Sequence, residues 1–190
     1  MTGDRPGVSI EDGFGTVKPS NASDYMLSCH ELFGFMPATL AIEIVDTIFH
    51  ADKPAYHTLL NTVAAARKVR PEFLQKKPRT ERHRDMATSL SSPRLEEAAA
   101  LLLRQWLTTT QSGMLVDFLN RLGIAHRQGI VEDFPDTVED AALAAAVEEL
   151  LGKYPEKNVS VYLHSLAAMK LVTWPNLATM LQQDPRVQLA

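Results

Sequence analysis

Apolar residues recur every three or four positions along most of the chain after residue 23, which is the spacing of one face of an α-helix. Two stripes show the pattern clearly: one consists of Leu40, Ile44, Val45 and Ile48, and the other of Leu95, Ala98, Ala99, Leu102 and Trp106. Helix start signals precede these and other stripes, at Ser23, Pro37, Asp52–Pro54, Ser92–Pro93 and Thr173–Pro175. The pattern predicts about eight helices joined by short connections.

Two glycines mark expected helix ends. Gly123 fits the left-handed backbone position that ends many helices, so Ile124 is expected to fold back onto Leu119. Gly152 is expected to end a helix that covers residues 141–151. Both glycines therefore set boundaries that the hydrophobic pattern leaves open.

These elements define an all-α fold, which we expect to be an irregular helical bundle or array in a single domain. Strand signals are weak, because only residues 124–134 alternate around a turn-like sequence, Arg127-Gln128-Gly129. This segment is expected to form either a small β-hairpin or a packed loop. No consensus recurs at a spacing of about 30–45 residues, so a known solenoid is not predicted.

Residues 1–22 differ in composition from the rest of the chain. They contain four glycines, two prolines and only isolated apolar side chains, so we expect a flexible or extended N-terminal arm before one domain over residues 23–190. Phe14 and Val17 are the side chains through which such an arm would dock. No signal peptide or membrane-spanning segment is apparent, and a single thiol fits a reducing compartment, so the expected location is the cytoplasm.

The composition excludes several classes of protein. With 45% apolar and 22% charged residues, the 190-residue chain is globular in character and long enough to fold without disulfides or a structural metal. Cys29 is the only cysteine, which excludes an intrachain disulfide and a cysteine-rich zinc site. The net charge of −4 gives no overall attraction to nucleic acids or acidic lipids.

The charges are distributed unevenly along the chain. Between residues 67 and 84, eight basic residues outnumber two acidic ones, Glu72 and Glu81. The basic residues are Arg67, Lys68, Arg70, Lys76, Lys77, Arg79, Arg82 and Arg84. Between residues 131 and 152, seven acidic residues occur without any Lys or Arg. The mildly acidic chain thus contains one strongly basic and one strongly acidic segment.

The basic segment has three interpretations. It is a solvated surface, a phosphate-binding patch for nucleic acid or another polyanion, or a surface that pairs with acidic protein. Phe73 is its only aromatic residue, and no nucleic-acid-binding motif accompanies it, so base stacking is poorly provided. The acidic partner is either residues 132–149 of the same chain or those of a second copy of it.

Other polar groups have weaker patterns. Glu43, Asp46 and His50 share one helix face near His57 and could hold a divalent metal, but they are also the polar side of an amphipathic helix. Residues 108–113 are rich in hydroxyl groups and suit either an anion or an ordinary helix kink. His126, in a long connection, is either catalytic or holds the loop together. Trp106 is expected in the core, and Trp174 lies either in the core or, half exposed, at a contact site.

No convergent catalytic set is present, so we expect no catalytic residues, metal or cofactor. The leading hypothesis is a non-enzymatic binding or scaffold protein that acts through an unidentified protein partner or self-association. The alternative is a protein that binds nucleic acid or another polyanion through residues 67–84. An enzyme that depends on a metal or on histidine is the third hypothesis, and a membrane partner is not expected.

Overall fold

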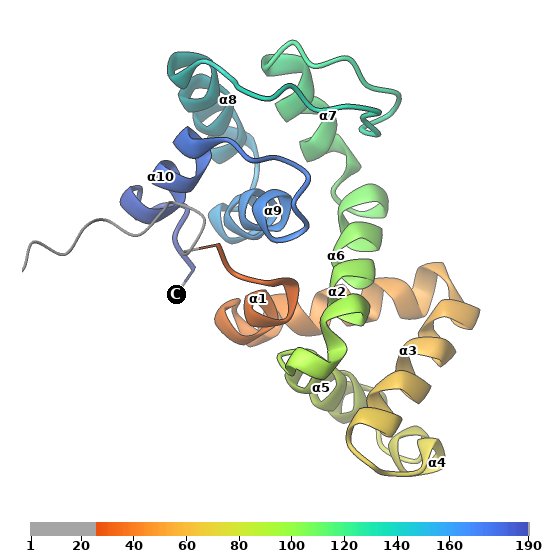
Figure 1. The fold of residues 1–190 in the computed structure, drawn as a ribbon. Coiled ribbons are helices and arrows are strands. Elements are labelled where there is room, and N and C mark those ends of the chain that lie inside the picture. Colours follow the sequence, from red (N-terminus) through yellow and green to blue (C-terminus); the bar gives the residue numbers. More distant parts are fainter. Residues whose placement is uncertain (1–25, 190) are drawn as a thin grey trace, which may run out of the picture.

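The computed structural model describes residues 26–189, which contain ten α-helices and one short 3-10 helix (Figure 1). The helices are α1 (Cys29–Phe35), α2 (Ala38–Ala51), α3 (Lys53–Ala66), α4 (Pro71–Gln75), α5 (Arg79–Ser89), η2 (Pro93–Leu95), α6 (Glu96–Thr109), α7 (Ser112–Arg121), α8 (Asp140–Lys153), α9 (Glu156–Ala168) and α10 (Pro175–Gln183). The expected all-α fold is confirmed. The arm expected at residues 1–22, with Phe14 and Val17, lies outside the described residues.

The two helices beyond the expected eight are α4 and α5. Both lie in the basic segment, whose sparse apolar residues give no clear stripe. Pro71 begins α4, and Pro78 directly precedes α5, where a proline is tolerated because the first backbone N–H groups of a helix have no partner within it. Leu74 of α4 and Met86 of α5 are fully buried, so each helix is held by tertiary packing as much as by its own sequence.

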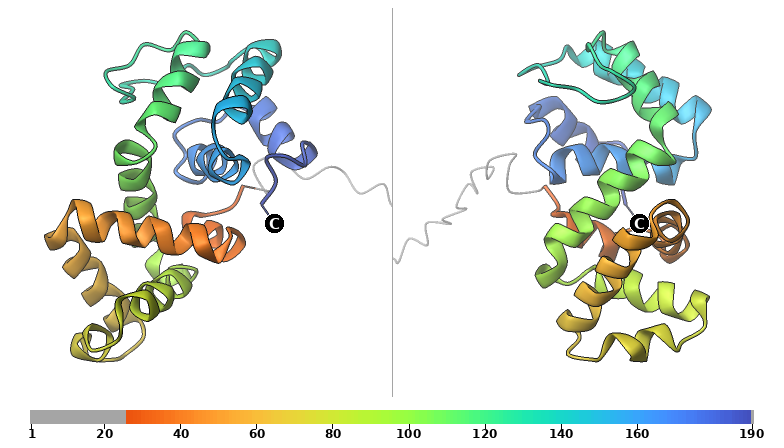
Figure 2. Two further views of the ribbon diagram at one scale, coloured as in Figure 1. Left: turned by 180° about the vertical axis from the view of Figure 1, so that it is seen from behind. Right: turned by 90° about the vertical axis from the view of Figure 1, so that its right-hand side faces the viewer.

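The helices form two groups that α6 connects. In the first group α2 packs against α3 and α5, and α4 packs against α3. In the second group α7 contacts α8, α8 contacts α9, and α9 contacts α10. The two views in Figure 2 show α6 running from one group to the other, with α1 beside it. Helix α1 contacts α5 of the first group and α9 of the second, as well as α6, and so lies against both groups.

A single cluster of buried apolar side chains extends through both groups of helices. Trp106 of α6 is fully buried and lies in this cluster, as expected from its place on an apolar stripe. Ile44 of α2 and Leu150 of α8 belong to the same cluster although they lie in different groups. The core is therefore continuous across α6.

Residues 122–139 connect α7 to α8 as a packed loop. A single antiparallel bridge joins Arg127 to Ile130, so the loop alternative is the one found for residues 124–134. Gly123 has a φ of +69°, and the Ile124 N–H donates to the Leu119 carbonyl over 2.9 Å, as the expected helix ending requires. The Gly123 prediction is confirmed.

One expectation about a single residue needs correction, and one pair of alternatives is decided. Gly152 is helical, because α8 continues to Lys153 and ends only at the extended backbone of Tyr154, which precedes Pro155. Of the two alternatives for Trp174, the core is the one found, because the residue is fully buried. Its indole N–H donates to the Pro135 carbonyl over 2.7 Å, so it fastens the end of the loop that precedes α8.

Between residues 26 and 189, no helix combines the length and the apolarity that crossing a bilayer would require.

Candidate functional site

The basic residues of the segment 67–84 are spread over the end of α3, α4 and α5, and four of them contact groups of their own neighbourhood. Arg67 and Lys77 lie 3.2 and 2.7 Å from the Asp85 carboxylate, and Lys77 also contacts Glu81 at 2.9 Å. The contacts with Lys77 and Arg67 lower the pKa of Asp85. Arg79 lies 3.9 Å from Asp46. These ion pairs neutralise part of the positive charge that the sequence concentrates here.

Arg82 is the fourth engaged residue and is tied to the protein interior. Its Nε donates to the Tyr56 hydroxyl over 2.7 Å, and its Nη1 donates to the Gln75 carbonyl over 3.1 Å. It therefore serves the packing of α5 on α3, and two of its three guanidinium nitrogens are engaged within the molecule.

Lys68, Arg70, Lys76 and Arg84 are exposed and have no ion pair within residues 26–189. Arg84 stands apart from the other three, because it lines a shallow hollow beside Phe33 and Ala38. The basic residues thus do not converge on one surface, which removes much of the basis for a broad polyanion site.

An exposed aromatic ring lies on α4, next to the ion-paired Lys77 and, in the sequence, between Arg70 and Lys76, which have no ion pair within residues 26–189. Phe73 is 54% exposed, and the Lys77 ammonium lies 5.4 Å from its ring centre. Arg70 directly precedes α4 and Lys76 directly follows it, so both flank the short helix that carries Phe73. We call Arg70, Phe73, Lys76 and Lys77 the α4 surface. A large apolar side chain among cations suits an acidic protein surface with an apolar group of its own.

The acidic segment does not supply that partner within the molecule. Helix α8 lies at the opposite end of the molecule from α4 in all three views (Figures 1 and 2). Its acids contact bases of their own end: Glu148 pairs with Arg186 at 2.6 Å, and Glu149 pairs with Lys153 at 2.8 Å. The acidic residues of α8 therefore do not pair with the α4 surface within the molecule.

A buried polar network lies beneath the basic segment. His83 Nδ1 is 3.2 Å from Asp46, and its Nε2 is 3.1 Å from the Tyr56 hydroxyl. Because that hydroxyl accepts from Arg82, it is free to donate to His83. Burial is the main cause that lowers the pKa of His83, and neighbouring Arg82 and Arg79 add to it against the opposing effect of Asp46.

This network resembles a relay, because both ring nitrogens of His83 are used. However, Tyr56 and His83 are only 3% and 1% exposed, so a substrate does not reach them in this conformation. The Phe49 ring packs edge-on against both rings and closes the site further. The network pins α2, α3 and α5 together.

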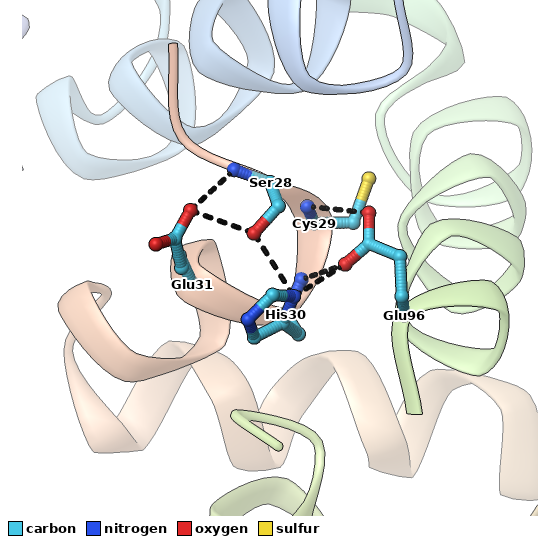
Figure 3. A network of polar contacts seen from close by, with 5 residues as sticks. All are labelled: Ser28, Cys29, His30, Glu31 and Glu96. Atoms are coloured by element: carbon cyan, nitrogen blue, oxygen red, sulfur yellow. Dashed lines mark hydrogen bonds and ion pairs between the residues drawn. The ribbon is translucent and has the colours of Figure 1, made fainter. Parts of the chain in front are cut away.

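A second polar network surrounds the start of α1 (Figure 3). Glu96 of α6 accepts the backbone N–H groups of Cys29 and His30 at 3.0 and 2.8 Å. His30 Nδ1 lies 2.7 Å from Glu96 and 2.9 Å from the Ser28 hydroxyl. A Ser-His-acid triad uses the two ring nitrogens separately, whereas both contacts here fall on Nδ1. The arrangement caps a helix with a carboxylate from a distant part of the chain.

Cys29 is a poor nucleophile in this setting. It is 1% exposed, and burial together with the neighbouring Glu96 raises its pKa to about 12. The thiol is therefore protonated at neutral pH, and the thiolate that would react is scarcely populated.

Three further candidates from the sequence, His50, residues 108–113 and His126, have local partners. His50 lies 3.3 Å from Asp46. Within residues 26–189, no group of three or more His, Cys, Asp or Glu side chains is placed to hold a metal ion. Residues 108–113 contain the break between α6 and α7, where the Thr109 hydroxyl donates to the Gln105 carbonyl over 2.7 Å. His126 accepts from the Gly129 N–H and contacts Asn120, so it holds the loop together.

Sequence reasoning missed the partnership of Asp46 with His83 and of Glu96 with Cys29 and His30. The partners are separated by 66 or 67 residues in the second network, and no local spacing relates them. The only signal was that His83 precedes Met86 by three residues, which places both on the buried side of α5. That signal becomes readable only once α5 is recognised as a helix.

Comparisons with protein-family models, with curated proteins and with solved structures gave no match for this chain. The described residues define an all-α protein whose main polar clusters are engaged in holding helices together. Its function is accordingly inferred from the chemistry of its surfaces.

Proposed function

We propose that this is a non-enzymatic binding protein that contacts an acidic surface of a protein partner through the α4 surface. The observation that carries the proposal is the 54% exposure of Phe73 between cations, two of which, Arg70 and Lys76, have no acidic partner in residues 26–189. Aromatic residues and arginine dominate the energetics of protein interfaces, and opposed charges orient and accelerate association.

Protein is favoured over nucleic acid as the partner for two reasons. Five of the eight basic residues are bound to their neighbours or, in the case of Arg84, lie apart from the α4 surface. Few cations are then left to release counterions from a phosphate backbone, which supplies most non-specific nucleic-acid affinity. In addition, one exposed aromatic ring gives little base stacking but is sufficient as an interface anchor.

The chain itself contains a suitable probe for the test. A labelled peptide with the sequence of residues 131–152 carries seven acids and several apolar residues, and a single-stranded DNA of matched charge serves for comparison. Fluorescence anisotropy at ~50 and ~200 mM salt should show that the peptide binds more tightly, with an affinity that falls as salt increases. Phe73→Ala should weaken peptide binding about tenfold, as expected for an interface anchor.

Two double variants that remove the same charge distinguish binding by the α4 surface from an effect of the net charge of the protein. Arg70→Gln with Lys76→Gln should weaken binding and reduce its dependence on salt, whereas Lys157→Gln with Lys170→Gln should leave both nearly unchanged. The latter two lysines are exposed; Lys157 lies on α9, and Lys170 lies two residues after its end. Tighter binding of DNA than of peptide, unaffected by Phe73→Ala, would establish the polyanion alternative. Failure of both probes to bind at low salt would refute an electrostatic binding role for the α4 surface.

A further inference from the structure

A mainly apolar pocket lies in the other group of helices, far from the α4 surface. It has a volume of about 400 Å³, within the range of roughly 300–1,000 Å³ that is usual for small-molecule sites. Leu107 of α6, Leu115 and Leu119 of α7, Leu166 of α9, and Ile130 and Phe134 of the connecting loop supply most of its wall. Ile130 is 65% exposed at the edge of the pocket.

The loop that forms one wall is fixed in place. The His126 ring accepts from the Gly129 N–H at 3.1 Å, and the Trp174 indole donates to the Pro135 carbonyl at 2.7 Å. Gly129 itself lines the pocket with a φ of +86°, a conformation that favours glycine. The pocket is therefore bounded by anchored backbone on the side of the loop.

Tyr162 of α9 presents an unpartnered polar group to this pocket. The residue is 1% exposed and lines the pocket, yet within residues 26–189 its hydroxyl has no hydrogen-bond partner. It is not among the polar atoms that are sealed inside the core without a partner, namely Trp106 Nε1 and Asn158 Oδ1. Buried tyrosines normally use their hydroxyl, and an unsatisfied one costs free energy, so this hydroxyl is available to a ligand.

Arg104 supplies a charge at the same pocket. It is exposed, lines the pocket, and has no ion pair within residues 26–189. Its neighbour Thr108 already donates its hydroxyl to the Arg104 and Gln105 carbonyls, so Arg104 and Tyr162 are the polar groups left for a ligand. A guanidinium fork matches the geometry of a carboxylate.

We propose that this pocket binds a small amphipathic carboxylic acid, whose hydrocarbon part contacts the leucine-rich wall and whose carboxylate interacts with Tyr162 and Arg104. The wall excludes water from the hydrocarbon part, and the phenol and the guanidinium both donate hydrogen bonds that a carboxylate accepts. The site is independent of the α4 surface and of the protein partner proposed for it.

Sodium decanoate is the probe for this site, with decanol and decyltrimethylammonium as neutral and cationic analogues of equal chain length. Titration of the full-length protein, followed in methyl NMR spectra, should shift the signals of Leu115, Leu166 and Met169, which line the pocket. Leu181, which lines a different groove, should not respond. Decanoate should bind about tenfold more tightly than decanol, because the charge-assisted hydrogen bonds are lost with the alcohol.

Two substitutions test the polar groups. Tyr162→Phe and Arg104→Gln should each weaken decanoate binding about tenfold, whereas Arg121→Gln, which changes an exposed arginine of α7, should have no effect. Tyr162→Phe should also leave the melting temperature of the ligand-free protein unchanged or raised, because the hydroxyl has no bond to lose. Tyr154→Phe is the comparison, since it removes a hydroxyl that donates to Asp117 over 2.8 Å and should lower the melting temperature.

Several outcomes would overturn the proposal. If millimolar decanoate shifts no methyl signals, the pocket does not bind such a ligand. If it shifts only the signals of residues outside the pocket, decanoate binds elsewhere. Equal binding of decanol and decanoate, with no effect of Arg104→Gln, excludes the carboxylate. A lowered melting temperature of Tyr162→Phe with unchanged decanoate affinity assigns the hydroxyl to the fold.

Discussion

Buried histidines are the residues whose charge state depends most on the fold. His83 is enclosed by Asp46, Tyr56 and the Phe49 ring, and His164 lies against the carbonyl of Val187 at 3.2 Å. Burial lowers the pKa of both residues, because it disfavours the charged imidazolium. Each ring is therefore held neutral at a pH at which the same residue in the unfolded chain begins to take up a proton.

We expect the free energy of unfolding to fall as the pH is lowered from 7 towards 5. Below the unfolded pKa of 6.5, the unfolded chain binds protons at positions 83 and 164 that the folded protein does not bind, so acid favours unfolding. This loss continues until the pH passes the lowered folded pKa. Urea unfolding at a series of pH values measures the effect.

His83→Gln separates this titration from other effects of acid. The variant should be less stable at pH 7 by about 1–3 kcal/mol, because contacts with Asp46 and Tyr56 are disturbed. The difference from the wild type should shrink towards pH 5, where the wild type loses its advantage. Val159→Ala, at a buried position that does not titrate, should show a constant difference. A constant difference for His83→Gln would contradict the assignment.

At the scale of elements, helix ends are fixed by two different means. Gly123 ends α7 through its own left-handed backbone and needs no other element. The start of α1 instead depends on Glu96 of α6, which accepts two of its backbone N–H groups. A helix of only seven residues is too short to be stable alone, so this bond to a distant helix is part of what forms it.

Alanine substitutions of two glycines should have opposite effects on stability. At Gly123, a Cβ meets no atom within 4 Å, so the cost of Gly123→Ala comes only from the φ of +69° and should be about 1–2 kcal/mol. At Gly152, also with open space but within α8, Gly152→Ala should stabilise the protein by about 0.5–1 kcal/mol. Denaturant unfolding of the two variants measures both effects. Effects of the same sign would contradict the placement of Gly123 after the end of α7 and of Gly152 inside α8.

At the scale of the whole molecule, α6 belongs to both groups of helices. It contacts α1, α2 and η2 at one side and α7 at the other, and the core cluster is continuous across it. Neither group of helices can then lose its packing without exposing part of the surface of α6. The uneven charge also spans the whole molecule, since the helices α4 and α8 lie at opposite ends (Figure 2).

We therefore expect the described part of the chain to unfold in one cooperative transition. Far-ultraviolet circular dichroism and the fluorescence of Trp106 and Trp174 should give coincident denaturation curves, and the calorimetric enthalpy should equal the van't Hoff enthalpy. Two separate transitions would instead divide the chain into independent units on either side of α6.

The class of fold could be predicted from the sequence because helical periodicity is local. Stripes such as Leu40–Ile48 recur within a few residues and require only that one face be buried, and Gly123 marks its boundary through its own conformational freedom. The same approach failed for α4 and α5, whose few apolar residues gave no stripe although Leu74 and Met86 are fully buried. For residues 67–84, the sequence shows the number of charges but not which of them form ion pairs.

The sequence by itself determined that the chain forms amphipathic helices with segregated charge, since both properties are read from neighbouring residues. Only the tertiary structure decided which basic residues are neutralised, that His83 meets Asp46 and Tyr56, and that Arg104 and Tyr162 share a pocket. These contacts join different helices, and their geometry depends on how side chains of all the helices pack. Periodicity specifies the buried face of each helix, whereas packing selects which face it meets.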